Sequence, residues 1–221
     1  LFAYNTVLLT AAGTGVLSFL VWAHHQFVAG IDPRMAHLFS ITTLIISIPV
    51  AEMVFVYIAT LYGASIHLNT PMLWALSFIG EFLMGGVTGI YLGASGSDIY
   101  FHDTYFVLAH FHYTFFPIAF IGTFAAVTHW FPKMFGRMMH DGWGKVHFWF
   151  TFIPLFLLGA RGDHRRIYDP THFPELMRAG MQDLRVLATV SLLVLLAAQV
   201  VFVVNLFYSM FFGPVASANP W

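Results

Sequence analysis

The chain has 221 residues, of which 59% are hydrophobic and only 9% are Asp, Glu, Lys or Arg. Soluble domains carry roughly 25% charged residues, so this composition excludes an ordinary soluble domain and indicates a membrane protein. The net charge of −1 argues against a nucleic-acid partner, and the absence of cysteine excludes disulfides and thiolate metal sites. Twelve histidines in so apolar a chain point to metal or proton chemistry. The sequence begins at Leu1 inside an apolar run and without a signal peptide, so we expect a piece of a longer polypeptide.

Six mostly apolar stretches predict six transmembrane helices, because a bilayer is crossed by about 20 such residues. The predicted spans are about 3–25, 36–62, 72–93, 105–132, 145–160 and 185–212. Helices are expected because backbone groups must find partners within the segment, and the runs lack the two-residue alternation of a strand barrel. The sequence therefore predicts an all-α membrane protein with a single membrane domain over residues 1–221.

Two adjacent histidines, His24 and His25, stand at the end of the first span. Neighbouring residues on a helix point about 100° apart, so both rings can converge on one ion if a third ligand comes from elsewhere. Sites rich in imidazole suit copper, zinc or iron. The alternative is a polar helix end with solvated histidines.

Glu52 and Glu81 are the only acidic residues deep inside the predicted spans. Ionisable groups at such depth are costly and usually functional. Counted from the span ends, the two lie at similar depth, so they could share a proton or a water chain. The alternative is a pair of protonated carboxyls, each bonded to a backbone carbonyl.

His110 and His112 stand near the start of the fourth span. Helical residues two apart point about 200° from each other, so these rings cannot share one metal but can each hold a separate group. Neutral imidazole is the usual axial ligand of heme iron, and one helix between two hemes would need this spacing. The alternative is two hydrogen-bonded, inert histidines near a membrane interface.

Arg165 and Arg166 form a pair in the loop after the fifth span. Adjacent guanidiniums near a membrane surface can bind carboxylates through two parallel hydrogen bonds, and heme propionates are such carboxylates. A solvated, charged loop is the alternative interpretation.

These motifs, in this order, resemble the C-terminal half of the catalytic subunit of heme-copper oxidases, cytochrome c oxidase subunit I, and the similarity covers nearly the whole chain. The matching segments are VWAHHQF (21–27), GIDPRMAHLF (30–39), MLWALSF (72–78), GGVTGI (85–90), SDIYFHDTYFVLAHFHY (97–113), HWFPKMFGR (129–137), RRIYD (165–169) and ANPW (218–221). The resemblance implies that the six spans are helices seven to twelve of a twelve-helix bundle.

The resemblance also implies two hemes and a copper ion. His24 and His25 match two of three copper ligands, His110 matches the axial ligand of the high-spin heme, and His112 matches one axial ligand of the low-spin heme. The remaining copper histidine, its cross-linked tyrosine and the second low-spin ligand belong to the N-terminal half of the family's subunit, which would be a partner of this chain.

Four further residues have family counterparts near the outer surface. His102 and Asp103 match ligands of a magnesium or manganese ion, and Arg165 and Arg166 match the pair that binds heme propionates. The other implied partners are oxidase subunits II and III and an electron donor such as cytochrome c. The implied location is a bacterial plasma membrane or the mitochondrial inner membrane.

The chain departs from the family in IPVAEMVF (48–55), where Val50 and Met53 replace a Thr and a Lys that conduct protons. The resemblance implies reduction of dioxygen to water with proton translocation, and Glu52 and Glu81 would then replace the lysine pathway. A nitric oxide reductase of the same superfamily is the alternative that the lost lysine favours. A non-catalytic membrane subunit is a third reading, against which the intact ligand set argues.

Overall fold

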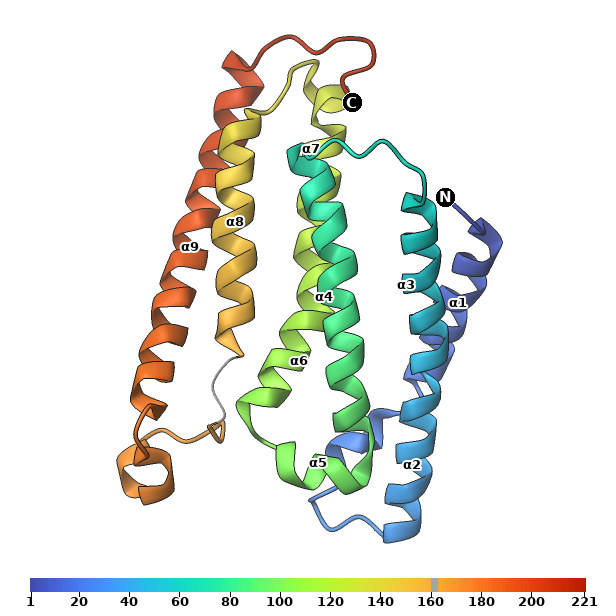
Figure 1. The fold of residues 1–221 in the computed structure, drawn as a ribbon, viewed down its shortest axis with the longest axis vertical. Coiled ribbons are helices and arrows are strands. Elements are labelled where there is room, and N and C mark those ends of the chain that lie inside the picture. The colour runs from blue at the N-terminus through green and yellow to red at the C-terminus, as the bar shows by residue number, and fades with distance from the viewer. Residues whose placement is uncertain (160–162) are drawn as a thin grey trace. The chain divides into compact units, whose positions relative to one another are not determined.

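The computed structural model describes residues 1–159 and 163–221, and its secondary structure is helical (Figure 1). In these residues the only β pairings are two isolated bridges, so the all-α prediction is confirmed. The chain divides into two compact units, which are treated separately below. Unit 1 comprises Leu1–Ser65, Ile79–Thr114 and His164–Arg166, and unit 2 comprises Ile66–Phe78, Phe115–Asp163 and Ile167–Trp221.

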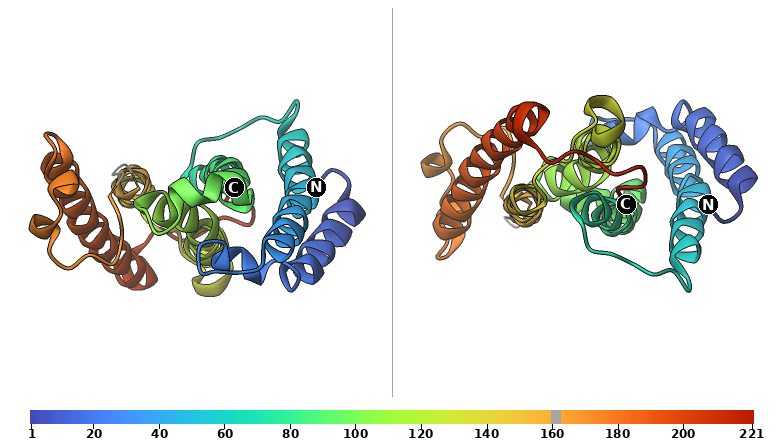
Figure 2. Two further views of the ribbon diagram at one scale, coloured as in Figure 1. Left: turned by 90° about the horizontal axis from the view of Figure 1, so that it is seen from below. Right: turned by 90° about the horizontal axis from the view of Figure 1, so that it is seen from above.

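Unit 1 begins with helices that run along one another, as α1 does beside α3 (Figures 1 and 2). Its elements are α1 (Tyr4–Ser18), the 3₁₀ helix η1 (Trp22–Gln26), α2 (Pro33–Ile45), α3 (Ser47–Leu61), most of α4 (Thr70–Gly93), α5 (Ser95–Phe101) and most of α6 (Tyr105–Phe116). Asp32 starts α2 by accepting a hydrogen bond from the Arg34 N–H at 2.8 Å, and Pro33 follows it at the first helical position.

Unit 2 is built around the antiparallel helices α8 and α9, which contact each other along their length (Figure 1). Its elements are the ends of α4 and α6, the π-helical turn η2 (Pro117–Ile121), α7 (Gly122–Phe135), α8 (Asp141–Leu158), the short 3₁₀ helices η3 (Pro170–His172) and η4 (Pro174–Met177), and α9 (Met181–Phe212). A buried cluster of Trp74, Ile121, Phe124 and Phe148 forms its core.

Polar side chains fix the register of α8 against α9. The imidazole of His147, 1% exposed, lies 3.2 Å from Gln199 Oε1, and the Gln199 amide donates to Thr151 Oγ1 at 3.0 Å. At the other end of the pair, the His140 N–H donates to Asn205 Oδ1 at 3.1 Å. Buried polar groups of this kind are stable only when paired, so each contact selects one alignment of the two helices.

Five of the six predicted spans correspond to helices that are long and apolar enough to cross a membrane. These are Tyr4–Gln26, Pro33–Leu61, Thr70–Gly93, Tyr105–Phe135 and Met181–Phe212. The span predicted at 145–160 is helical as α8, but α8 begins earlier and is not among the five in the described residues. Its 18 residues include Asp141, Lys145 and His147, which lower its hydropathy, and residue 160 lies outside the described part of the chain.

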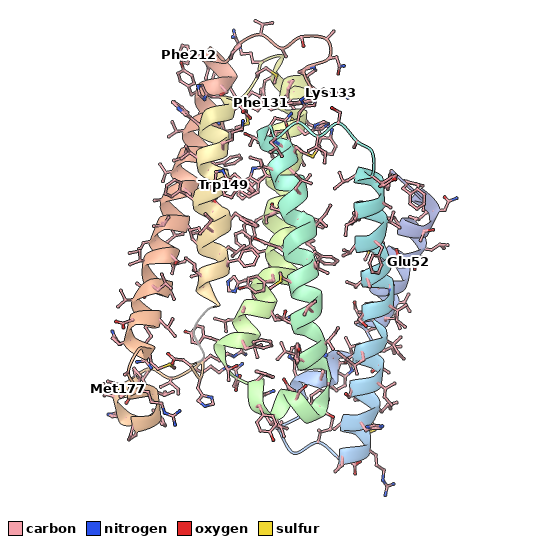
Figure 3. All side chains as sticks on the ribbon, viewed as in Figure 1. Glu52, Phe131, Lys133, Trp149, Met177 and Phe212 are labelled. Atoms are coloured by element: carbon pink, nitrogen blue, oxygen red, sulfur yellow. The ribbon has the colours of Figure 1, made fainter. Side chains whose placement is uncertain are left out.

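Large apolar side chains project outward from both units, as expected for surfaces that face lipid or other membrane helices. Phe19 is 83% exposed and Phe55 is 69% exposed in unit 1. Figure 3 labels Trp149 on α8 and Phe212 at the end of α9, which are 48% and 71% exposed in unit 2. The chain is therefore an integral membrane protein.

Candidate metal centre

The two adjacent histidines, His24 and His25, lie in η1 and face each other. Their Nε2 atoms are 3.0 Å apart. Two imidazole nitrogens this close together could bind one ion between them, and sites rich in imidazole suit copper, zinc or iron. The donor chemistry and spacing therefore fit a shared copper ion.

A hydroxyl on α2 sets the tautomer of His24. Thr43 Oγ1 donates to the carbonyl of Phe39 at 2.6 Å, so it is an acceptor for the Nδ1–H of His24, which lies 3.2 Å away. A proton on Nδ1 leaves a lone pair on Nε2, the atom that faces His25. A hydrogen bond of this kind, from the ring nitrogen that does not bind the metal, orients a metal-binding histidine. Among the described residues no group of three or more His, Asp or Glu side chains is placed to hold one ion, so a third ligand would come from elsewhere.

His110 lies on the face of α6 that packs against α4. Its Nδ1 donates to the carbonyl of Gly85 at 2.9 Å, and Thr88 Oγ1 lies 3.2 Å from the same nitrogen. The ring covers Gly89, where an added Cβ would stand 2.9 Å from His110 Cε1. The glycine thus makes room for the ring, and the Gly85 carbonyl leaves Nε2 free to bind a metal.

His112 has the same tautomer by a different contact. Its Nδ1 donates to the carbonyl of Leu108, one turn earlier on α6, at 2.7 Å. Residues 110 and 112 both lie within α6, so their side chains point about 200° apart around the helix axis. Each ring therefore presents a free Nε2 on its own side of α6, as two separate axial ligands would require.

The predicted propionate-binding arginines contact Asp103. Arg165 Nε donates to Asp103 Oδ1 at 2.9 Å, and Arg166 Nη1 donates to Oδ2 at 3.2 Å. The Arg165 N–H also donates to the Asp103 carbonyl at 2.8 Å. Asp103 and Arg166 have positive φ angles of 53° and 66°, which are uncommon outside glycine and mark a constrained loop pair. Each guanidinium has five N–H donors, so donors remain for a further carboxylate.

The imidazole of His102 is hydrogen-bonded to Asp98. Its Nδ1 lies 2.9 Å from Asp98 Oδ2, and Asp98 is only 3% exposed. Burial raises the pKa of Asp98, while the hydrogen bond from His102 opposes that rise. The sequence reasoning missed Asp98, although its i, i+4 spacing to His102 around α5 was a usable signal.

The two membrane carboxyls differ in their surroundings. Glu52 lies on an exposed face of α3 (Figure 3). Glu81 on α4 is fully buried, and neither of its carboxyl oxygens has a hydrogen-bond partner among the described protein groups. Among the described residues no hydrogen bond joins the two carboxyls, because neither oxygen of Glu81 makes one. The idea that they share a proton remains a prediction.

Known proteins similar to this chain are oxidase subunits. The family described as cytochrome c and quinol oxidase polypeptide I matches residues 1–194. Cytochrome c oxidase subunit 1 of Synechocystis is 39% identical over all of this chain and 40% of that protein. The alternative cytochrome c oxidase subunit 1 of Bradyrhizobium diazoefficiens is 40% identical over all of this chain and 38% of its own length.

A quinol oxidase and a solved structure extend this similarity. Quinol oxidase subunit 1 of Bacillus spizizenii is 38% identical over 95% of this chain and 32% of that protein. A heme-copper terminal oxidase dimer solved by cryo-EM shares the fold, with a TM-score of 0.73 and 18% identity over 93% of this chain and 42% of that one. The chain thus spans about 40% of the length of its curated relatives. It belongs to the cytochrome c and quinol oxidase polypeptide I family.

Proposed function

We propose that this chain forms the C-terminal half of the catalytic subunit of a terminal respiratory oxidase, which reduces dioxygen to water and translocates protons. The proposal includes a single membrane domain of six spans, α8 being the fifth, within a twelve-helix bundle. The observation that carries it is the pair His110 and His112. Both rings use Nδ1 for a backbone carbonyl and keep Nε2 free, on opposite sides of one helix.

In this proposal the histidines hold the redox groups. His24 and His25 bind copper, His110 binds the iron of the high-spin heme, and His112 binds the iron of the low-spin heme. These groups, when bound, supply the electron transfer and oxygen binding that amino-acid side chains lack. The protein would orient these groups through the histidine rings. Thr43 holds the His24 ring, and backbone carbonyls of α4 and α6 hold the rings of His110 and His112.

The arginine pair and its neighbours form the outer edge of the proposed site. Arg165 and Arg166 would bind heme propionates through the N–H groups that Asp103 leaves unused. Asp103 would share its carboxylate between these cations and the magnesium or manganese ion that it holds with His102. Each carboxylate oxygen has two lone pairs, which allows both contacts at once.

The proposal assigns further parts of the enzyme to segments outside this chain, which spans about 40% of the length of its curated relatives. The N-terminal half of the same subunit would supply the third copper histidine and the second low-spin ligand, and subunits II and III would complete the complex. The similar proteins are named as cytochrome c and quinol oxidases, so cytochrome c or a comparable donor would deliver electrons. The bacterial relatives favour a bacterial plasma membrane over the mitochondrial inner membrane.

Protons must reach the site by a route other than the family's Thr and Lys, because Val50 and Met53 occupy those positions. We propose that the route uses the membrane carboxyls Glu52 and Glu81. The same departure is the observation that favours the second candidate function, nitric oxide reduction by a relative that does not pump.

Purified full-length complexes with His110 or His112 replaced by Ala test the proposal. Loss of His112 should abolish the low-spin heme spectrum, whereas loss of His110 should remove carbon monoxide binding at the other heme. Metal analysis of the wild type should find copper together with two hemes. Iron in place of copper, with consumption of nitric oxide and not dioxygen, would establish the second function. A wild-type complex without heme absorbance would refute both.

A further inference from the structure

We propose that Glu81 is the last proton carrier before the proposed metal site of this enzyme. Its carboxyl holds a proton on the face of α4 that contacts His110 of α6, and it passes that proton on during turnover. This inference rests on the proposed function and separates the two membrane carboxyls. Glu52, on the exposed face of α3, is not needed for this last transfer.

Burial requires that Glu81 hold a proton in the resting protein. The side chain is 0% exposed, and neither carboxyl oxygen is hydrogen-bonded to a described protein group. Neither α4 nor α6 contains Lys or Arg that could pair with a carboxylate. An ionised carboxylate without a partner in such a place costs several kcal/mol, so the neutral acid is the stable form.

The position of Glu81 on α4 directs it toward α6. Glu81, Gly85 and Gly89 are spaced four residues apart and so share one face of the helix. An added Cβ on Gly85 would stand 2.8 Å from the carbonyl oxygen of Tyr113, and one on Gly89 would stand 2.9 Å from the ring of His110. Glu81 is thus one turn, about 6 Å along the axis, beyond the point where α4 and α6 touch.

The groups that face Glu81 connect it to the proposed metal site. Tyr113 of α6 lies within electrostatic range of the Glu81 carboxyl, and His110 lies about one turn from Tyr113 on α6. The carbonyl of Gly85, the next residue on the Glu81 face, accepts the hydrogen bond from His110 Nδ1 at 2.9 Å. Tyr113 and His110 are the titratable residues that α6 presents on this side. A proton released from Glu81 therefore starts next to the helix face that holds the proposed axial ligand.

The chemistry balances if Glu81 is a carrier and not a consumed reactant. Reduction of one dioxygen to two waters takes four protons, and four electrons from the proposed external donor. In each transfer the O–H bond of the Glu81 carboxyl breaks, and an O–H bond forms on a water or reduced oxygen toward the site. A proton from the aqueous side then restores the carboxyl, so Glu81 is unchanged after each cycle.

Infrared difference spectra of the full complex, oxidised minus reduced, test this role. Wild type and the matched control Glu52→Gln should both show a change in the carbonyl stretch of a protonated carboxyl, with a shift in D₂O. Glu81→Gln should lose that band and turn over at least roughly tenfold more slowly, while its heme spectra stay unchanged. Glu81→Asp, which keeps the proton, should move the band and recover part of the rate.

Persistence of the band in Glu81→Gln would overturn the inference, as would a wild-type rate for that variant at every pH at which the wild type works. Loss of the band in Glu52→Gln would also overturn it, since Glu52 would then be the carrier. If Glu81→Gln does not assemble, Glu81→Asp decides the matter, and an unmoved band there refutes the role. Failure of the proposed function is recognised separately, because the wild-type complex itself would then lack heme or dioxygen consumption.

Discussion

Replacing Arg185 by Met tests the buried ion pair at the start of α9. Arg185 Nε donates to Asp163 Oδ2 at 2.7 Å, and Arg185 Nη2 donates to the carbonyl of Leu176 at 2.7 Å. The side chains of Arg185 and Asp163 are only 13% and 5% exposed. The second carboxylate oxygen, Asp163 Oδ1, is buried and has no hydrogen bond to a described protein group.

The expected loss of stability is large because the substitution strands a charge. Removing one partner of a buried ion pair typically costs about 3–5 kcal/mol. In the double variant Asp163→Asn, Arg185→Met no charge remains, and the cost should fall to about 1–3 kcal/mol, the range for an unsatisfied buried polar group. The double variant should therefore be more stable than Arg185→Met alone.

Denaturant unfolding of the full complex in mixed micelles, followed by tryptophan fluorescence, measures these differences. Arg185→Lys is the matched control, because it keeps the charge and loses only the geometry of the guanidinium. If the free energy of unfolding of Arg185→Met is within about 1 kcal/mol of the wild-type value, the ion pair contributes no more than an exposed one and the prediction is wrong. A double variant less stable than Arg185→Met would also refute the reasoning, because the stranded charge would then not be the cause.

Two further predictions use the same unfolding assay. Gly85→Ala should destabilise by roughly 1–3 kcal/mol, because its Cβ would stand 2.6 Å from a side-chain atom of α6 and 2.8 Å from a backbone oxygen. Gly86→Ala, with nothing within 4 Å, should instead be neutral or stabilising, and equal effects would contradict the close approach. Burial raises the pKa of Asp141, but hydrogen bonds from Lys145 and Thr70 outweigh it and hold the value below the usual 3.8. The unfolded chain then binds more protons, so stability present above pH 3.8 should be lost as the pH falls further, and Asp141→Asn should lose this dependence.

The helices were predictable where apolar residues run without interruption, because length and composition alone decide whether a segment can cross a bilayer. The exception is α8, whose polar first turn contains Asp141 and Lys145. That turn is held by tertiary contacts, since the Asp141 carboxylate accepts hydrogen bonds from both the N–H and the hydroxyl of Thr70 at 2.8 Å. Contacts between residues distant in the chain leave no local pattern, so the start of α8 could not be placed from the sequence.

In the candidate site, the directions of the histidine rings could be predicted from the sequence, but the hydrogen bonds could not. The opposite directions of His110 and His112 follow from helical periodicity. The contact between Asp103 and Arg165 does not, because these residues are 62 positions apart and meet through a loop with a positive φ angle. Counting residues placed both membrane carboxyls at similar depth, but depth does not reveal which face of a helix is covered. Packing decides that, and it buries Glu81 alone.

The length of α9 sets how deep that helix can lie in a membrane. It has 32 residues, and residues 186–212 contain no Asp, Glu, Lys or Arg. At about 1.5 Å per residue the uncharged stretch is about 40 Å long, which exceeds the hydrocarbon core of about 30 Å even at a usual tilt of about 20°. The excess is about 8 Å along the bilayer normal, so α9 can shift by about that much while Arg185 and Asp163 stay outside the hydrocarbon. A larger inward shift would carry their charges into the hydrocarbon core, so this ion pair limits how far α9 can move in that direction.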